Sequence, residues 1–455
     1  MRRSDSIGAG LGLWLRSVTV AALLALAAVG VQAAPPPARF PQPEFESGYV
    51  QPLTSVPLPR SLALEYADVG VLTAALALAS WLALRRRSRG GLVALTLFTV
   101  GYFGFFRRGC VCPVGAIQDV VTVLADPAQA IPWTVAAFFL LPLVFAALFG
   151  RVFCAAVCPL GALQELVLWK PVRVPSWLSA PLKMMPVIYL GLAVLLAATG
   201  ADYLICRTDP FIGFYRLGGP RPMLLAGGLL LVLGLFVGRP YCRFLCPYGV
   251  LLGWVSRFAF RHATITPDGC VNCRLCEPAC PYDCVRVPES EPPPEPRGKT
   301  RRRLVRALAM IPFLTLAGAG IGGALQVPLS RSHAEVRLAE QVALEASGQP
   351  TACTVESEAF RTSGRPLADL AASAGRIRRA FGIGSVLLGG FIGLLLGVRL
   401  AGLVLPSRRA CHDMDRAECV SCARCFASCS VEQAKRTALA RPVEPPESPG
   451  GTHVG

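Results

Sequence analysis

The sequence predicts an all-α polytopic membrane helix bundle, about seven spans after a signal peptide, with a small α+β ferredoxin-like module for two 4Fe–4S clusters. Three observations predict it. The chain is 53% hydrophobic and only 16% charged, which is unusual for a soluble domain. Several apolar runs approach the ~20 residues of a spanning helix. Most of the 18 cysteines fall in tight clusters with metal-site spacing.

The amino terminus resembles a secretory signal over residues 1–33. A basic "MRR" precedes an apolar stretch from Ile7 to Val31. Small residues stand at the third and the first position before a signal-peptidase cleavage site after Ala33. The alternative is an uncleaved amino-terminal anchor helix. Residues 34–60 are rich in proline and are expected to form an exported, extended linker.

Seven apolar runs are the predicted spans. They cover residues 62–84, 91–106, 131–149, 185–205, 222–238, 304–328 and 381–405. With residue 60 outside, the first span delivers the basic run 85–89 to the cytoplasm, as the positive-inside rule requires. Alternation then places residues 329–380 outside and both long cysteine clusters in the cytoplasm. Three arginines in 375–381 lie outside in this scheme, against the rule.

The net charge of +17 reflects this topology. Basic runs at 85–89 and 299–306 adjoin apolar runs, as cytoplasmic loops do. No nucleic-acid partner is therefore expected. The predicted location is the bacterial inner (cytoplasmic) membrane, in the lipid bilayer, with several passes.

The strongest motif is "CVNCRLCEPACP" at 270–281, the bacterial ferredoxin run C-x2-C-x2-C-x3-C-P. A second run, "CVSCARCFASCS" at 419–430, has serine in place of the proline. In two-cluster ferredoxins each run gives its fourth cysteine to the other cluster. The expected ligand sets are Cys270, Cys273, Cys276 and Cys429 for one cluster and Cys419, Cys422, Cys425 and Cys280 for the other. Two zinc sites are the alternative, but zinc ligands usually come as separated pairs.

The two runs are separated by two predicted spans. An even number of spans returns the chain to the same side of the membrane, so both runs can share ligands in the cytoplasm. A single miscounted span between them would remove this possibility.

A second motif occurs twice, each time directly after a span. "GRVFCAAVCPLGAL" and "GRPYCRFLCPYGVL" share G-R-x2-C-x3-C-P-x-G-x-L. The proline suits the first turn of a helix, whose positive end favours a thiolate. The motif predicts a further iron–sulfur centre or a redox-active thiol site on the cytoplasmic face; a packing and turn element is the alternative. The candidate metal ligands are Cys154, Cys158, Cys242 and Cys246.

An altered copy, "RRGCVCPVGAIQD", is predicted to lie outside. Its cysteines and two more on that side are Cys110, Cys112, Cys206 and Cys353. The first three are weaker candidate metal ligands, and disulfides are the alternative that an exported compartment favours. Cys284 and Cys411 remain unassigned.

Other cofactor sites lack support in the sequence. None of the four histidines lies within a predicted span, and neither C-x-x-C-H nor a G-x-G-x-x-G opening a βαβ unit occurs. No catalytic residue is predicted. Glu65, Asp68 and Asp202 near the outer span ends could receive protons from a quinol, or could be interface charges. Asp119 and Glu165 follow cysteine motifs and are expected to cap or solvate helices.

Over residues 60–435 these motifs resemble the NosR/NapH family of polyferredoxin-like membrane proteins. The resemblance implies passage of electrons between the quinone pool and respiratory reductases, or a part in their maturation. Three departures stand against it. Residues 34–60 are too short to replace the large flavin-binding exported domain of NosR-type members. One motif is C-x-C-P. The second ferredoxin run is separated from the first by two predicted spans and lacks the proline.

The predicted function is electron relay between quinol and a partner redox protein, as a component of a quinol dehydrogenase. A maturation or redox-regulatory factor for a respiratory metalloenzyme is the rival. The predicted domains after the linker are a helix bundle with C-P-x-G motifs (61–260), ferredoxin motif 1 (261–300), a two-span hairpin with an exported loop (301–410), ferredoxin motif 2 (411–440) and a disordered tail (441–455).

Overall fold

The structure is a computed structural model that describes residues 61–109, 112–265, 270–271, 273–286, 297–347, 353–404 and 412–434. The predicted signal peptide, exported linker and carboxyl-terminal tail lie outside these residues. So do Cys110 and Cys411.

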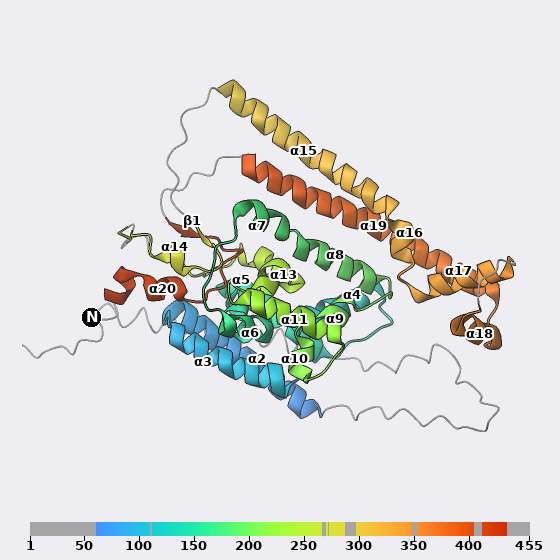
Figure 1. The fold of residues 1–455 in the computed structure, drawn as a ribbon, viewed down its shortest axis with the longest axis horizontal. Helices are drawn as coiled ribbons and strands as arrows, with labels where there is room; N and C mark the ends of the chain where they lie inside the picture. Colours follow the sequence, from blue (N-terminus) through green and yellow to red (C-terminus); the bar gives the residue numbers. More distant parts are fainter. Residues whose placement is uncertain are drawn as a thin grey trace, which may run out of the picture.

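Helices dominate the described chain (Figure 1). The bundle contains α2 (Leu62–Ser80) continued by the π-helical η1 (Trp81–Arg85), α3 (Arg89–Thr99) continued by η2 (Val100–Phe106), α4 (Pro113–Ala125), α5 (Trp133–Phe149), η3 (Phe153–Val157), α6 (Pro159–Val167), α7 (Ser176–Leu182), α8 (Met185–Ala198), α9 (Leu204–Thr208), α10 (Ile212–Arg216), α11 (Arg221–Gly234), α12 (Pro240–Phe244) and α13 (Pro247–Ser256). The carboxyl-terminal part contains α14 (Cys276–Ala279), β1 (Val285–Arg286), α15 (Arg297–Ala324), α16 (Gln326–Ser330), α17 (Ala334–Ala346), α18 (Val355–Thr362), α19 (Leu367–Val404), β2 (Asp413–Met414) and α20 (Arg424–Ser428).

All seven predicted spans are largely helical, but they differ in length. Five helical stretches of the described chain are long and apolar enough to cross a membrane: Leu62–Arg85, Arg89–Phe106, Ser176–Ala198, Arg301–Ala324 and Leu367–Gly402. The predicted spans at 131–149 and 222–238 correspond to the shorter apolar helices α5 and α11. The last span begins 14 residues earlier than predicted, at Leu367 rather than 381, because the residues before 381 continue the same helix.

The two longest helices, α15 and α19, form an antiparallel hairpin on one side of the bundle (Figure 1). Their backbones meet at glycines. A Cβ on Gly318 or Gly389 would collide with the facing backbone, so these positions require glycine, as do close helix crossings in membranes. On its other side α19 packs on α8.

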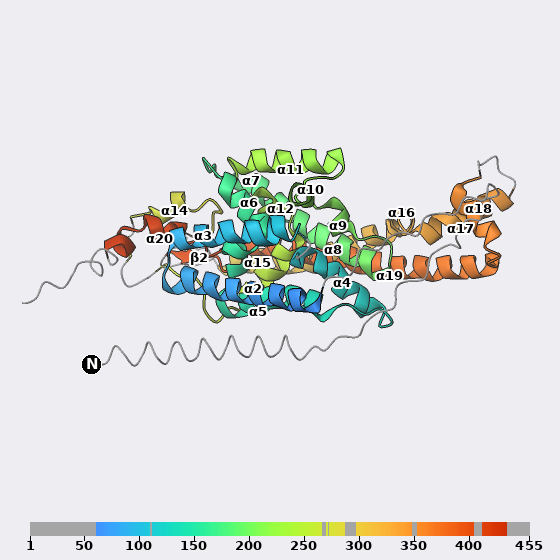
Figure 2. The same ribbon diagram turned by 90° about the horizontal axis from the view of Figure 1, so that it is seen from below.

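The cysteine-rich runs meet at one end of the molecule. Strands β1 and β2 pair antiparallel, with Val285 opposite Met414, and α14 contacts α20. Helices α17 and α18 lie at the opposite end in both views (Figures 1 and 2). The hairpin between the two runs therefore returns the chain to its starting end, as the even span count requires.

Candidate iron–sulfur centres

Two matched turns hold the cysteines of the C-x3-C-P motifs. Cys158 caps α6 and Cys246 caps α13, and a proline begins each helix, where a missing N–H costs nothing. The amide of Gly249 donates to Cys246 Sγ at 3.4 Å. A Cβ on Gly161 would lie 3.5 Å from Cys242 Sγ. Glycine in C-P-x-G thus lets the partner motif approach, and both motifs contribute to one site.

The four thiols of this inner thiol site (Cys154, Cys158, Cys242 and Cys246) lie close together. Three of these cysteines are buried, and Cys242 is partly buried. Burial raises the pKa of Cys158, and the neighbouring Cys242, Cys154 and Cys246 raise it further. Burial also raises the pKa of Cys246, against a smaller lowering by the Gly249 amide. The expectation that the helix ends favour thiolates is therefore wrong here, because desolvation outweighs the amide donors. A bound metal would have to displace these protons.

Cationic and amide donors surround the inner thiol site. Arg151 lies 3.8 Å from Cys154 Sγ through Nη2, and Gln164 donates to Cys242 Sγ at 3.4 Å. The Arg151 Nε is buried and has no hydrogen-bond partner among the described residues. A four-thiolate iron–sulfur cluster carries net negative charge and accepts hydrogen bonds at its sulfurs. The donor set therefore fits a 4Fe–4S cluster.

The ferredoxin runs line two small cavities. One, of about 40 Å³, is lined by Cys270, Cys273, Cys276 and Cys429, together with Cys425. The other, of about 20 Å³, is lined by Cys280, Cys419, Cys422 and Cys425. The structure thus brings together the two crossed sets that the spacing predicts, each with one cysteine of the distant run. Their ligand role stays a prediction.

One cysteine in this region was left unassigned by the sequence. Cys284 is buried and lines the same cavity as Cys280. A hydrogen bond from the Cys284 thiol lowers the pKa of Cys280 to about 6. Cys284 is thus placed to donate to a ligand sulfur, a role that the spacing C-P-x2-C alone does not indicate.

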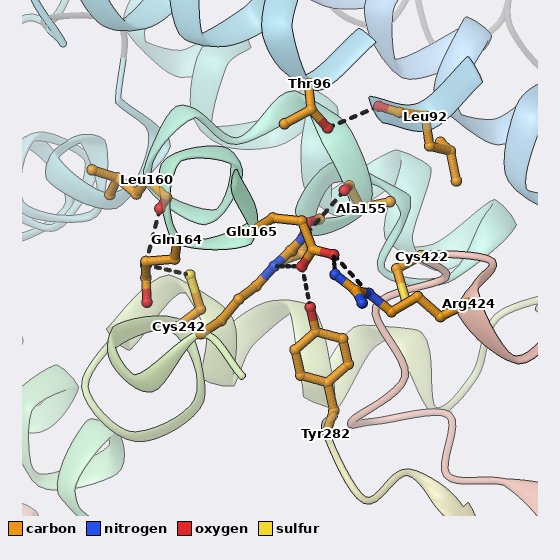
Figure 3. A network of polar contacts seen from close by, with 12 residues as sticks. Leu92, Thr96, Ala155, Leu160, Gln164, Glu165, Cys242, Tyr282, Cys422 and Arg424 are labelled. Atoms are coloured by element: carbon orange, nitrogen blue, oxygen red, sulfur yellow. Dashed lines mark hydrogen bonds and ion pairs between the residues drawn. The ribbon is translucent and has the colours of Figure 1, made fainter. Parts of the chain in front are cut away.

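A buried carboxylate joins the ferredoxin runs to the inner thiol site (Figure 3). Glu165 on α6 is 5% exposed. It pairs with Arg239 of the second C-x3-C-P motif at 3.0 Å, with Arg424 of the second ferredoxin run at 2.7 Å and with Arg89 at 2.5 Å. The Tyr282 hydroxyl, from the first ferredoxin run, donates to it at 2.5 Å.

The partners of Glu165 decide its charge. Burial alone would raise its pKa, but Arg239, Arg424 and Arg89 and the Tyr282 hydroxyl together lower it to about 2. The expectation that Glu165 caps or solvates a helix is wrong, because the carboxylate faces four partners inside the protein. Sequence reasoning missed it since those partners lie on four distant segments.

A third cavity, of about 320 Å³, which we call the outer cavity, lies at the end of the bundle away from the ferredoxin runs (Figure 1). It is lined by Cys112, Cys206 and Asp209 among others; Cys110 lies outside the described residues. Burial, and then the charge of Asp209, raise the pKa of Cys112 to about 12. No disulfide joins two of the described cysteines, so the expected bridges are not formed among them. Cys353 lies elsewhere, beside Arg361.

Acidic side chains line the same outer cavity. Asp68 is buried and pairs with Arg107 at 2.9 Å, while Tyr102 donates to it at 2.8 Å. Glu65 accepts from Thr134 at 3.3 Å. Asp202 instead pairs with the exposed Arg207 at the surface. Asp68 is thus not a solvated interface charge, whereas Asp202 fits that description.

Over the described ranges, no three His, Cys, Asp or Glu side chains converge as ligands of a single metal ion. This finding concerns one ion and not a four-iron cluster, which holds its ligand sulfurs farther apart.

Comparison with known proteins places the three segments that carry the C-x-C-P and C-x3-C-P motifs in a family. A model of the 4Fe-4S binding domain matches residues 90–129, 131–179 and 219–264. The chain is 29% identical over 156 residues to the "Putative electron transport protein YccM" of Escherichia coli K12, covering 30% of this chain and 43% of that protein. It is 31% identical over 201 residues to the "Uncharacterized protein MJ0750" of Methanocaldococcus jannaschii, covering 42% and 80%. It is 31% identical over 190 residues to the "Regulatory protein NosR" of Pseudomonas aeruginosa, covering 37% and 25%.

Together these matches place the chain among proteins with a 4Fe–4S binding domain, and the structure adds apolar helices long enough to cross a membrane. No solved structure matches the chain. The chain belongs to the NosR/NapH-like 4Fe–4S proteins, which confirms the resemblance. It spans less than half of the E. coli relative and a quarter of the P. aeruginosa one.

Proposed function

We propose that this chain relays electrons between the quinone pool and a partner redox protein, across the bacterial inner membrane, with its ferredoxin runs in the cytoplasm. The observation that carries the proposal is the contact of three cysteine sets at one end of the bundle. The inner thiol site and both ferredoxin runs meet through Glu165. Bound there, 4Fe–4S clusters would supply one-electron transfer.

The eight ferredoxin cysteines are the proposed ligands of two clusters, and the inner thiol site is proposed to hold a third. Arg151 and Gln164 would donate to its sulfurs, and Arg239 is fully buried beside it. Positive charge and hydrogen bonds at cluster sulfurs favour the reduced form. The protein's contribution is thus placement, exclusion of water and tuning of potential.

The outer cavity is the proposed place of quinol contact. Glu65 and Asp68 line it, and both sit on α2 near its outer end. A quinol gives up two protons for every two electrons, so carboxylates beside the ring are suitable acceptors.

Stopped-flow reduction of the purified protein by a quinol analogue tests the relay. We expect bleaching of iron–sulfur absorbance, with slower reduction in Glu65→Gln. Asp202→Asn is the matched control, since Asp202 pairs with Arg207 at the surface. Fully assembled clusters that no quinol reduces would contradict the relay from quinol.

A maturation or regulatory role is the second candidate, favoured by similarity to a relative named "Regulatory protein NosR". It predicts assembled clusters without steady turnover. Repeated quinol oxidation in the presence of an electron acceptor would exclude it. A colourless preparation with fewer than about four irons per chain would contradict the iron–sulfur assignment itself.

A further inference from the structure

The outer cavity is built from a second copy of the inner thiol site. Two segments share the pattern C-P-x-G-A-x-Q followed by an acid: residues 112–119 and 158–165. Each begins with a cysteine that caps a helix and a proline at the first helical position, on α4 and on α6. Sequence similarity of this kind predicts a shared local structure, and the contacts of the two segments test it.

The buried glutamine makes the same contact in both copies. Gln164 Oε1 accepts from the amide of Tyr241 at 3.0 Å, and Tyr241 precedes Cys242. Gln118 Oε1 accepts from the amide of Ile205 at 2.9 Å, and Ile205 precedes Cys206. Both glutamines are fully buried. Cys206 therefore occupies the place that Cys242 has in the inner site.

The glycines of both copies support this equivalence. A Cβ on Gly161 would lie 3.5 Å from Cys242 Sγ, and a Cβ on Gly115 would lie 3.1 Å from Cys206 Sγ. In each copy the glycine three residues after the capping cysteine lets the partner thiol approach. Cys112 and Cys206 thus correspond to Cys158 and Cys242.

The fourth position of the copy holds a carboxylate. In the inner site Cys246 follows Cys242 by four residues and precedes a proline, and its Sγ accepts from the Gly249 amide. Asp209 follows Cys206 by three residues and also precedes a proline. Its Oδ1 accepts from the Phe211 amide at 2.9 Å. Asp209 is 5% exposed and lines the cavity with Cys112 and Cys206.

The two copies adjoin each other. The rings of Phe211 and Tyr241 contact edge to face, with centroids 5.4 Å apart. Tyr215 on α10 donates to the carbonyl of Pro159 at 2.7 Å. The segment after Asp209 therefore packs directly on both motifs of the inner site.

We propose that the part of the outer cavity lined by Cys112, Cys206 and Asp209 is a second membrane-embedded 4Fe–4S site, in which the carboxylate of Asp209 is a ligand together with the thiolates of Cys112 and Cys206. Glu65 and Asp68 line another part of the same cavity, where the quinol contact is proposed. The proposal rests on the iron–sulfur chemistry proposed above, but its test measures iron rather than electron transfer.

Iron and acid-labile sulfide per full-length chain, with Mössbauer spectroscopy, test the site. We expect Cys206→Ala and Asp209→Ala each to lower iron by about four per chain, and Asp202→Ala to leave it unchanged. A double variant with Cys158→Ala should lose about eight. Asp209→Cys should keep the iron and change the Mössbauer parameters, because one iron exchanges oxygen for sulfur.

Two results would overturn the outer site. One is wild-type iron content in Cys206→Ala and Asp209→Ala while Cys158→Ala loses its share; the relay function then stands without it. The other is an Asp209→Cys spectrum identical to that of the wild type. If an alanine variant loses all iron through misfolding, the Asp209→Cys spectrum decides.

Discussion

The inner thiol site and the outer cavity use one backbone pattern in opposite electrostatic surroundings. The cavity at the inner site, about 120 Å³, is lined by six cationic side chains and one acid: Arg151, Lys183, Arg239, Arg243, Arg257, Arg399 and Glu418. The outer cavity is lined by four acids and two arginines: Glu65, Asp68, Asp119, Asp209, Arg107 and Arg216. The C-P-x-G turn therefore fixes where ligands lie, while the surrounding charges differ from copy to copy.

This difference has a consequence for electron affinity. Positive charge near a centre stabilises the reduced state, and negative charge stabilises the oxidised state. The inner site should then have the higher reduction potential of the two. Acidic groups at the outer end also suit proton release from a quinol. The surrounding charges alone thus favour electron transfer from the outer cavity to the inner thiol site.

The largest expected effect is loss of the inner centre. Cys158→Ala and Cys246→Ala should each remove the same iron, about four atoms per chain, because the two thiols face one site. The double variant should lose no more than either single one. Iron analysis and EPR of the reduced protein measure this.

Cys353→Ala is the control for these variants, since Cys353 is exposed beside Arg361. Additive losses in the double variant would show that the two cysteines hold different irons. The inner site would then not be the counterpart of the outer one.

The next effect concerns stability and compares Glu165 with Asp119, the acids at the equivalent last positions of the two C-P-x-G-A-x-Q segments. Glu165→Gln leaves three arginines facing a neutral side chain, and breaking such a buried network typically costs about 3 to 5 kcal/mol. Asp119→Asn at the equivalent position should change stability by less than about 0.5 kcal/mol, since Asp119 is only partly buried and forms no ion pair among the described residues. Denaturant unfolding in detergent measures both, and equal effects would contradict the docking role of Glu165.

How much of this followed from sequence depends on the range of the interaction. Spacing within a run predicted the crossed cysteine sets, because ligand spacing is local and an even span count places the runs together. It also paired Cys154 with Cys242 through a shared motif. The role of Glu165 was missed, because its partners Arg89, Arg239 and Arg424 lie far apart in the chain. Asp209 was missed because no cysteine marks the fourth position of the copy.

The pH dependence of stability sharpens the contrast between Glu165 and Asp119. The folded pKa of Glu165 is about 2 against 4.5 for the free side chain. Its stabilisation is therefore complete above pH 4.5 and is lost as pH falls toward 2. The difference in unfolding free energy between wild type and Glu165→Gln should narrow over that window. Comparing the two proteins at each pH removes the acid lability that they share. A difference in unfolding free energy that stays constant between pH 4.5 and 2 would contradict the charged network.

The smallest effect concerns the charge beside the inner thiols. Arg151→Gln removes a cation whose Nη2 lies 3.8 Å from Cys154 Sγ, so the reduction potential of the inner centre should fall. Arg257→Gln is the matched control, because Arg257 lines the same cavity and should shift the potential less. EPR-monitored redox titration measures both. An unchanged potential in Arg151→Gln would show that the basic surroundings of the inner site do not set its electron affinity, and the electrostatic contrast with the outer cavity would then have no redox consequence.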